Sequence, residues 1–212
     1  METSNPHYVT YQLEKEIARY TGAPYCVCVD NESNALYMTL VFVGVKDKEI
    51  LIPPFTYPSV ACEIINAGGK VKFDKWLKSD NILTGQYQLK PTNVWDSALT
   101  FTADMFKKGQ FQCLSFTGQW KRLKTVKGGA ILTDSVAAYK WFKKYRFSGR
   151  NECSYHADNF TMIGHNYYMP HILAAIGLQT IQGFYNLDGT KKHFEDISLP
   201  YPDLSKFPIY KT

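Results

Sequence analysis

Four short segments of the sequence carry polar side chains of the kinds that enzymes use to hold and transform a ligand. Ser33, Tyr57 and Asp96 each lie at or just beyond the end of a short β-prone run, and Lys121 lies in a basic segment, SFTGQWKRLKTVKGGAILT, between two such runs. A hydroxyl at a helix N-terminus can hold a phosphate, because free backbone N–H groups and the helix dipole favour an anion there. An acid can hold a protonated ring nitrogen, an aromatic side chain can stack on a planar ring, and a lysine amine can form an imine with an aldehyde.

Together these four abilities are what a protein contributes to the chemistry of pyridoxal phosphate. Each residue taken alone also has an ordinary structural interpretation. Lys121 could be a solvated loop lysine like its neighbours, Asp96 could cap a turn, and Tyr57 could belong to the rim of the core. Ser33 could be the N-cap of a helix, which is compatible with a phosphate contact.

The elements that must position these residues follow from hydrophobic periodicity and from the glycines that end it. We expect helices over 11–22, 33–44, 134–149 and after Pro170, and one more that Gly68 and Gly69 end. We expect strands over 25–29, 49–53, 70–74, 93–98, 112–116 and 129–133, and a loop over 75–92. Alternating strands and helices predict an α/β domain of three layers, α/β/α, with a mostly parallel sheet. In such a sheet ligands gather at the carboxyl ends of the strands, where the four polar segments lie.

Composition sets bounds on the class of protein. The 212 residues, 45% hydrophobic and 20% charged, are ordinary for a soluble globular protein. The net charge of +5 is spread along the chain, and its densest run, WFKKYRFSGR, is most simply the polar face of a helix, so we expect no nucleic-acid partner. The cysteines have no zinc or redox spacing, so we expect no metal site. Without a signal-peptide pattern or a run long enough to span a bilayer, we expect a cytoplasmic protein with no membrane partner.

Five blocks of sequence, in order, carry a family resemblance that covers roughly residues 10 to 185. The chain resembles the DegT/DnrJ/StrS family of sugar aminotransferases, which are fold-type-I enzymes that use pyridoxal 5'-phosphate. The blocks are LEKEIARYTGAPYCVCVDNESNALYMTL, ILIPPFTYPSVACEIINAGGKVKFD, VWDSA, CLSFTGQWKRLKTVKGGAILT and GHNYYMPHILAAIGLQTI. The resemblance implies a fold-type-I large domain over 1–190, followed by an extended tail over 191–212 in place of most of the family's small C-terminal domain.

The resemblance also implies roles for individual residues, according to their positions in these blocks. Lys121 is similar to the catalytic Schiff-base lysine, since it lies eight residues before Gly129, as the family lysine does. Asp96 is similar to the acid that pairs with the pyridine nitrogen, and Ala98 to a small residue under the ring. The remaining implied cofactor contacts are the stacking aromatic Tyr57, the phosphate-turn residues Glu32 and Ser33, the phosphate hydroxyl of Ser115, and Asn166, which reaches the phosphate across a dimer interface.

The resemblance implies a homodimer in which an amino-acid donor such as glutamate aminates a nucleotide-linked keto-sugar. Several positions depart from the family pattern. Glu32 stands where the family has glycine, Leu99 replaces a glutamine near the ring hydroxyl, and Tyr168 replaces an arginine. One strand–helix unit of the family is missing between 75 and 95. These departures keep open an alternative: a degenerate member that binds pyridoxal phosphate or a sugar nucleotide without transaminating.

Overall fold

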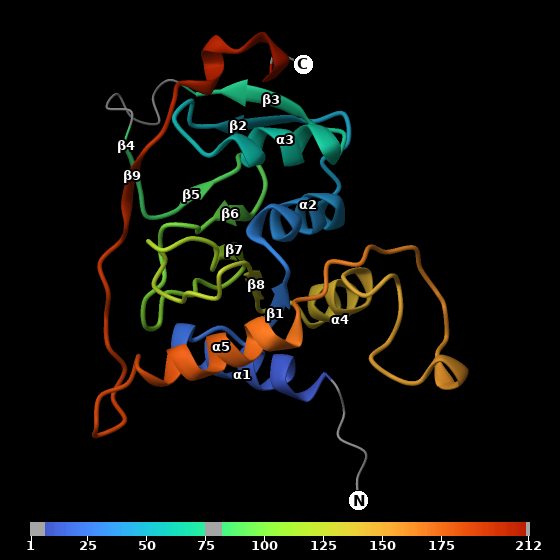
Figure 1. Cartoon of the computed structure of the whole chain (residues 1–212). Helices are drawn as coiled ribbons and strands as arrows, with labels where there is room; N and C mark the ends of the chain where they lie inside the picture. Colours follow the sequence, from blue (N-terminus) through green and yellow to red (C-terminus); the bar gives the residue numbers. More distant parts are fainter. Residues whose placement is uncertain (1–6, 75–81, 211–212) are drawn as a thin grey trace, which may run out of the picture.

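A five-stranded sheet forms the centre of the protein (Figure 1). The structure, a computed structural model, describes residues 7–74 and 82–210. The strands lie in the spatial order β1, β8, β7, β6, β5. Their bounds are β1 (Tyr25–Val29), β5 (Tyr87–Gln88), β6 (Val94–Asp96), β7 (Phe111–Ser115) and β8 (Gly129–Thr133).

The strand directions make this a mixed sheet, so the prediction of a mostly parallel sheet is wrong. Only the β6–β7 pair of the described sheet is parallel, whereas β1–β8, β7–β8 and β5–β6 are antiparallel. Residues 116–128, between β7 and β8, contain no helix. A parallel neighbour needs a long crossover connection, and without one the chain returns beside the strand it has just left. Ser115 at the end of β7 therefore lies opposite Gly129 at the start of β8.

Helices cover both faces of the sheet and give it three layers. They are α1 (Tyr8–Thr21), α2 (Glu32–Val43), α4 (Val136–Tyr145) and α5 (His171–Gln182). Successive side chains of β1 point to opposite faces. Val27 and Val29 accordingly pack in a core with residues of α2 and α4. Cys26 and Cys28 pack in a second core with residues of α1 and α5.

The N-cap of α2 differs from the prediction by two residues. The helix begins at Glu32, and its N-cap is Asn31 rather than Ser33. The side-chain oxygen of Asn31 accepts a hydrogen bond from the backbone N–H of Asn34 at 2.8 Å. This contact satisfies one of the free N–H groups of the first turn, which is the usual function of an N-cap side chain. Ser33 is therefore left in the first turn of the helix.

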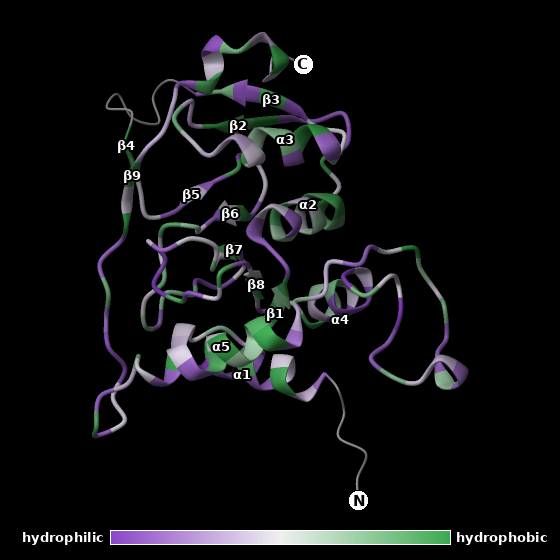
Figure 2. Ribbon diagram, viewed as in Figure 1, coloured by the Kyte–Doolittle hydropathy of each residue, from purple (hydrophilic) through white to green (hydrophobic). Residues whose placement is uncertain are grey.

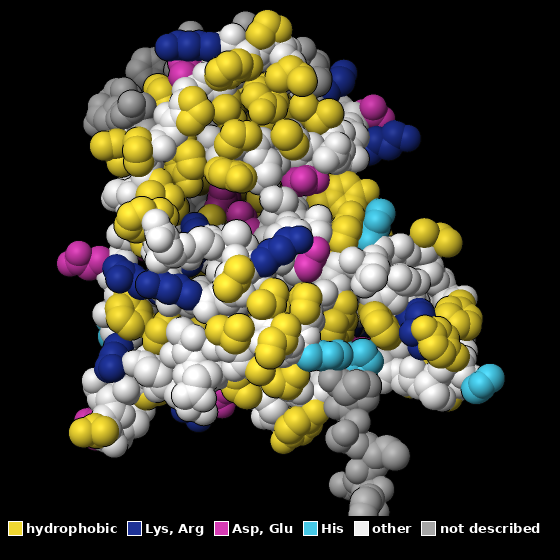
Figure 3. All heavy atoms as spheres, viewed as in Figure 1, with side chains coloured by type: hydrophobic (Ala, Val, Ile, Leu, Met, Phe, Trp, Pro, Cys, Tyr) yellow, Lys and Arg dark blue, Asp and Glu magenta, His cyan; other side chains and the backbone are white. Residues whose placement is uncertain are grey.

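A smaller layer lies beside the main sheet. In it β2 (Glu49–Ile52) and β3 (Lys70–Phe73) form a parallel pair packed on α3 (Pro58–Asn66). Figure 3 shows hydrophobic side chains gathered over this part of the molecule. The expected loop over 75–92 instead contains the short strands β4 (Ile82–Thr84) and β5, and its residues 75–81 lie outside the described chain. Between residues 82 and 95 the chain forms no helix.

The C-terminal segment runs from the end of α5 along the edge of the molecule to the β2–β3 layer (Figure 1). Its strand β9 (Ser198–Pro200) pairs antiparallel with β4. The short 3-10 helices η2 (Leu204–Lys206) and η3 (Pro208–Tyr210) follow it, and another, η1 (Tyr155–Ala157), lies between α4 and α5. Leu204 is buried in the first core, so the segment is anchored. The division into a domain over 1–190 and a tail stays a prediction.

Candidate active site

A cavity of about 270 Å³ opens at the start of α2 and contains most of the residues that the sequence singled out. Six of them line it: Glu32, Ser33, Tyr57, Ala98, Ser115 and Lys121. Asp96 lies buried directly behind them, in electrostatic contact with Glu32 and Lys121. The structure thus brings together seven of the eight predicted site residues. The remaining wall is formed by Asn31, Thr117, Trp120, Leu199 and Tyr201.

Lys121 is a buried lysine, not a solvated one. Its side chain comes from the loop between β7 and β8 and is 8% exposed. Its Nζ donates a hydrogen bond to the backbone oxygen of Ala98. Burial lowers the pKa of Lys121, and the nearby charges of Glu32 and Asp96 only partly restore it, so the pKa lies below its usual value. The amine is therefore easier to deprotonate than that of an exposed lysine.

Two carboxyl groups face Lys121. Asp96 ends β6, and its Oδ1 accepts a hydrogen bond from the backbone N–H of Ala98 at 2.9 Å. Burial raises the pKa of Asp96, and burial followed by the charge of Asp96 raises the pKa of Glu32 well above its usual value. The two carboxyl groups lie close enough to share a hydrogen bond, which raises the pKa of Glu32 and lowers that of Asp96. Lys121 acts in one sense on both, since its positive charge favours the ionised form of each acid.

The glycine pair at the start of β8 explains how α2 comes so near to Lys121. A Cβ atom on Gly129 would lie 2.6 Å from the backbone nitrogen of Glu32 and 2.7 Å from the backbone carbon of Asn31. Because the backbone itself blocks any side chain there, only glycine lets the first turn of α2 rest on the sheet. The glycine at position 129 therefore has a packing reason.

Aromatic side chains form the outer wall of the cavity. Tyr57, which follows β2, is 55% exposed, and its ring meets that of Tyr201 edge-on with centroids 6.3 Å apart. Tyr201 and Leu199 come from the C-terminal segment, and the sequence analysis did not include them in the site. No local pattern marks them, because the pairing of β9 with β4 is what brings them to the cavity.

Asn166 is the one predicted residue that the structure does not bring to the cavity. It is exposed and pairs in an isolated bridge with Phe147, after α4. Its neighbour Tyr167 accepts a backbone hydrogen bond from Asp30, so the segment lies near the start of α2. Within one chain Asn166 is therefore not among the residues that line the cavity.

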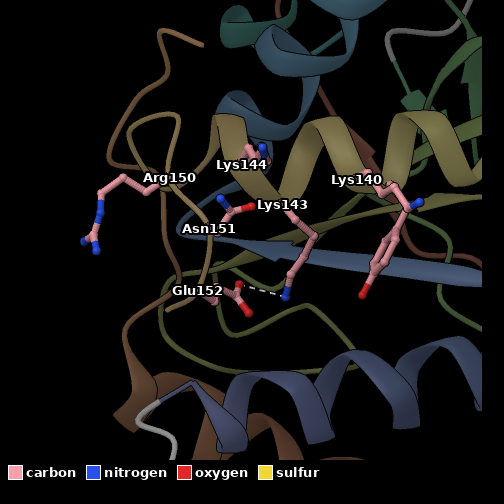
Figure 4. Close-up of a pocket in the computed structure, with 7 residues that line it drawn as sticks. Lys140, Lys143, Lys144, Arg150, Asn151 and Glu152 are labelled. Carbon is pink, nitrogen blue, oxygen red and sulfur yellow. Dashed lines mark ion pairs between the residues drawn. The ribbon is translucent and has the colours of Figure 1, made fainter. Parts of the chain in front are cut away.

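A second cavity, of about 400 Å³, lies between α4 and the loop after it (Figure 4). Its lysines and arginine do not converge on a common point. Lys143 turns to Glu152, with which it pairs at 2.7 Å, while Arg150 points away and pairs with Asp158. Lys144 donates to Thr161. These three side chains thus form separate local ion pairs and hydrogen bonds and do not make a common binding site.

Glu152 makes stability depend on pH at the acid end. Burial alone would raise its pKa, but Arg146 and Lys143 together hold that pKa below its usual value of 4.5. An acid whose pKa is lower in the folded protein than in the unfolded chain stabilises the fold. This stability is fully present above the unfolded pKa and is lost as the pH falls through the folded pKa. We expect the free energy of unfolding, measured with urea, to fall below pH 4.5. Glu152→Gln should reduce this dependence, and an unchanged pH profile would contradict the assignment.

Two further features bear on the class of site. In the part of the chain that the structure describes, no three His, Cys, Asp or Glu side chains are grouped as they would be to hold a metal ion. Among the described helices, none is both long enough and apolar enough to cross a membrane.

Solved structures of sugar aminotransferases share this fold. PseC of Helicobacter pylori, an aminotransferase involved in the biosynthesis of pseudoaminic acid, matches with a TM-score of 0.68 at 15% identity over 82% of this chain and 57% of its own. The sugar aminotransferase Spr1654 of Streptococcus pneumoniae, in its PLP form, matches with a TM-score of 0.61 at 19% identity over 82% of this chain and 59% of its own. The chain therefore has an α/β fold of the kind found in pyridoxal-phosphate-dependent sugar aminotransferases.

The sequence comparison identifies the family. Residues 6–80 and 104–197 match the DegT/DnrJ/EryC1/StrS aminotransferase family, and the chain belongs to that family. It is 22% identical over 241 residues to the UDP-4-amino-4,6-dideoxy-N-acetyl-beta-L-altrosamine transaminase of Campylobacter jejuni. That match covers 95% of this chain and 63% of the relative, so the chain spans less than two thirds of the relative's length. The resemblance predicted from the sequence blocks is confirmed.

The donor set of the cavity suits pyridoxal phosphate with one exception. A buried amine, a buried acid, two hydroxyls and an aromatic ring surround the cavity, as this cofactor requires. The exception is Glu32. Its Oε1 is buried without a hydrogen-bond partner among the described residues. It belongs to the first residue of α2, and the N-terminus of a helix favours an anionic ligand.

Proposed function

We propose that this chain is a pyridoxal-phosphate-dependent aminotransferase that transfers an amino group from an amino-acid donor to a nucleotide-linked keto-sugar. The observation that carries the proposal is the buried amine of Lys121 beside Asp96 on an open cavity. Family membership supports the reaction class. The name of the Campylobacter jejuni relative supports a nucleotide-linked sugar as the substrate class.

Each residue of the cavity has a defined task in this proposal. Bound pyridoxal phosphate supplies an electron-accepting ring that stabilises a carbanion next to nitrogen. Lys121 would provide the amine that attaches the cofactor, and its lowered pKa makes it better suited than an exposed lysine to give up and take back a proton. Asp96 keeps the pyridine nitrogen protonated. Tyr57 and Ala98, which both line the cavity, would hold the ring between them.

Ser33 and Ser115 complete the site as the hydroxyls that hold the phosphate. Both line the cavity, and Ser33 lies in the first turn of α2, where backbone N–H groups also favour an anion. Phosphate contacts of this kind orient the ring, so that the amine of Lys121 meets the aldehyde carbon.

A homodimer is part of the proposal. Much of α5 is coloured as hydrophobic in Figure 2, and two of its residues, Ile172 and Ile176, are exposed, Ile172 by 69%. An exposed apolar face of this kind favours contact with a second protein surface. Asn166 lies just before this helix and is also exposed, as a residue that serves the partner's cavity would have to be.

Borohydride reduction tests the cofactor assignment. We expect the protein mixed with pyridoxal phosphate to absorb visible light, and borohydride to fix the cofactor permanently to the peptide that contains Lys121. Lys121→Ala should retain no reducible link at that peptide, as judged by mass spectrometry, whereas Lys124→Ala, in the same loop but exposed, should behave like the wild type. A Lys121→Ala protein that still traps the cofactor in the same way would refute the role of Lys121.

A second candidate is a family member that binds the cofactor without transaminating. Two observations favour it: the buried acid Glu32 at the start of α2, whose Oε1 has no hydrogen-bond partner among the described residues, and Leu99, which is buried in the core where the family has a glutamine. An amino-acid donor distinguishes the candidates. If the bound cofactor is never converted to its amino form by glutamate or any other amino acid, this second function holds instead of the first.

A further inference from the structure

A tyrosine to which the proposed function gives no task lies beside Asp96. Tyr87 of β5 is the antiparallel partner of Asp96 of β6, so the two side chains project from the same face of the sheet at neighbouring positions. Both are buried. The adjacent pair of residues fixes this register, since the hydroxyl of Ser97 donates to Oε1 of Gln86 at 2.9 Å. Residue 87 lies between the two ranges of the chain that match the family, so no family motif marks it.

Two hydrogen bonds link Thr56, Tyr87 and Asp96 in that order. The side-chain oxygens of Thr56 and Tyr87 are 2.6 Å apart, and Thr56 is fully buried. Tyr87 and Asp96 lie close enough to share a second hydrogen bond. An ionised carboxylate only accepts hydrogen bonds, so Tyr87 donates its single proton to Asp96, and Thr56 donates its own to Tyr87. Each hydroxyl of the series thus orients the next group.

Asp96 needs such donors, because burial disfavours its charged form. Burial raises the pKa of Asp96, while the backbone N–H of Ala98, and next the hydroxyl of Tyr87, act to lower it. Burial, followed by the charge of Asp96, raises the pKa of Tyr87 well above its usual value, so Tyr87 keeps the proton that it donates.

Other titratable groups also face Asp96, and they come from every element packed around it. These groups are Glu32 of α2, Lys121 of the β7–β8 loop, Cys113 of β7 and Tyr201 of the C-terminal segment. Lys121 and Glu32 favour the charged form of Asp96, but less than Tyr87 does. Tyr87 is therefore the side chain that most favours an ionised Asp96.

We propose that Tyr87 is a positioning residue for the reaction: held by Thr56, its hydroxyl donates to the carboxylate of Asp96 and fixes the orientation in which that carboxylate meets the cofactor. Neither Tyr87 nor Thr56 lines the cavity, so both act through Asp96. Thr56 directly precedes Tyr57, which does line it, so the same hydrogen bonds tie the acid to the loop that carries the aromatic wall. This inference rests on the proposed function, in which Asp96 keeps the ring nitrogen protonated.

The titration of Asp96 in the protein without cofactor tests the contact itself. NMR of isotope-labelled aspartate carboxyl groups measures it, and Asp96→Asn identifies the signal by its loss. Tyr87→Phe removes the hydroxyl and keeps the ring. Because a donor to the charged form lowers the pKa of an acid, we expect the midpoint of the Asp96 titration to move to higher pH in this variant. Tyr20→Phe removes another buried tyrosine hydroxyl, which donates to the backbone oxygen of Lys192 at 2.7 Å, and should leave the midpoint unchanged.

Two substitutions of Thr56 separate positioning from packing. Thr56→Val keeps the branched shape and removes the hydroxyl that orients Tyr87, so the Asp96 midpoint should move in the same direction as in Tyr87→Phe, by a smaller amount. Thr56→Ser retains the hydroxyl and should keep the wild-type midpoint. A purely structural role of this position predicts the opposite order, because valine fills the buried space of threonine better than serine does.

Turnover provides a second readout. We expect Tyr87→Phe to lower kcat by about tenfold, the scale of one hydrogen bond to a charged group, with KM for the amino donor unchanged. In an Asp96→Asn background the same substitution should change kcat little, since Tyr87 acts through the charge of Asp96. A purely structural role would instead lower kcat by the same factor in both backgrounds.

The outcomes distinguish this inference from the proposed function. An unchanged Asp96 midpoint in Tyr87→Phe, or an equal loss of kcat in both backgrounds, overturns the role of Tyr87, while a borohydride-reducible link at Lys121 still supports the proposed function. If the wild type forms no such link at Lys121, the proposed function fails and this inference fails with it. Thermal unfolding shows which variants are folded, and if Tyr87→Phe is not, the comparison of Thr56→Val with Thr56→Ser decides the inference.

Discussion

Glu14→Ala should destabilise the protein by about 3–5 kcal/mol, because it leaves the charge of Arg146 buried without its main partner. The side chain of Arg146 is 0% exposed, and its guanidinium donates to Glu14, to Glu152 at 2.7 Å and to the backbone oxygen of Cys28. Lys143 also pairs with Glu14, at 3.2 Å. Urea unfolding followed by circular dichroism measures the effect.

A matched control lies two residues further along the same helix. Glu16 pairs with the largely exposed Arg19 at 3.6 Å, and a surface pair of this kind contributes at most about 1 kcal/mol. Glu16→Ala should therefore change the midpoint of urea unfolding only slightly. If the two variants lose equal stability, the buried pair between α1 and the end of α4 does not hold those elements together.

Asp96→Asn should lower the turnover of the proposed transamination by about 10²–10³-fold, the scale on which loss of one preorganised electrostatic contact reduces turnover. Asparagine keeps an oxygen that can accept from Ala98, as Asp96 does at 2.9 Å, but it has no charge to hold a ring nitrogen in its protonated form. The loss should therefore appear in kcat for any amino donor.

The same substitution has a readout that does not depend on turnover. The charge of Asp96 raises the pKa of Lys121 against the effect of burial, so removing that charge lowers the pKa further. Lys121 would then be deprotonated at lower pH, and its reaction with pyridoxal should begin at lower pH than in the wild type. Asp134→Asn, which alters an acid that accepts from Gly109 at the surface, should leave the profile unchanged. A profile that does not move in Asp96→Asn would contradict the electrostatic contact.

The sequence predicted which residues lie together at the cavity better than it predicted the strand directions of the sheet, and the reason is physical. Gly129, the reference point from which Lys121 was located, marks a backbone approach that only glycine permits, so it is visible in one chain. Strand direction leaves no such mark, because a buried strand has the same hydrophobic residues in either direction. The absence of a helix over 116–128 was the available signal that β7 and β8 run antiparallel.

Long-range contacts account for other differences between the predicted and the observed structure. Leu199 and Tyr201 line the cavity only because β9 pairs with β4, and a segment with three prolines gave no indication of that pairing. The N-cap of α2 was misplaced because Asn31 and Ser33 are both suitable capping residues, and only the hydrogen bond to Asn34 decides between them.

The wall that Tyr201 provides has a consequence for the order in which the site is assembled. Glu32, Asp96 and Lys121 all precede β9 by a long stretch of chain, and contacts between residues so far apart in sequence form late. A ribosome delivers the N-terminal part first, so the nascent chain can present its reactive amine before the aromatic cover exists. Selectivity for a ligand, as distinct from simple reactivity toward aldehydes, is then acquired only after β9 has been synthesised and has paired with β4.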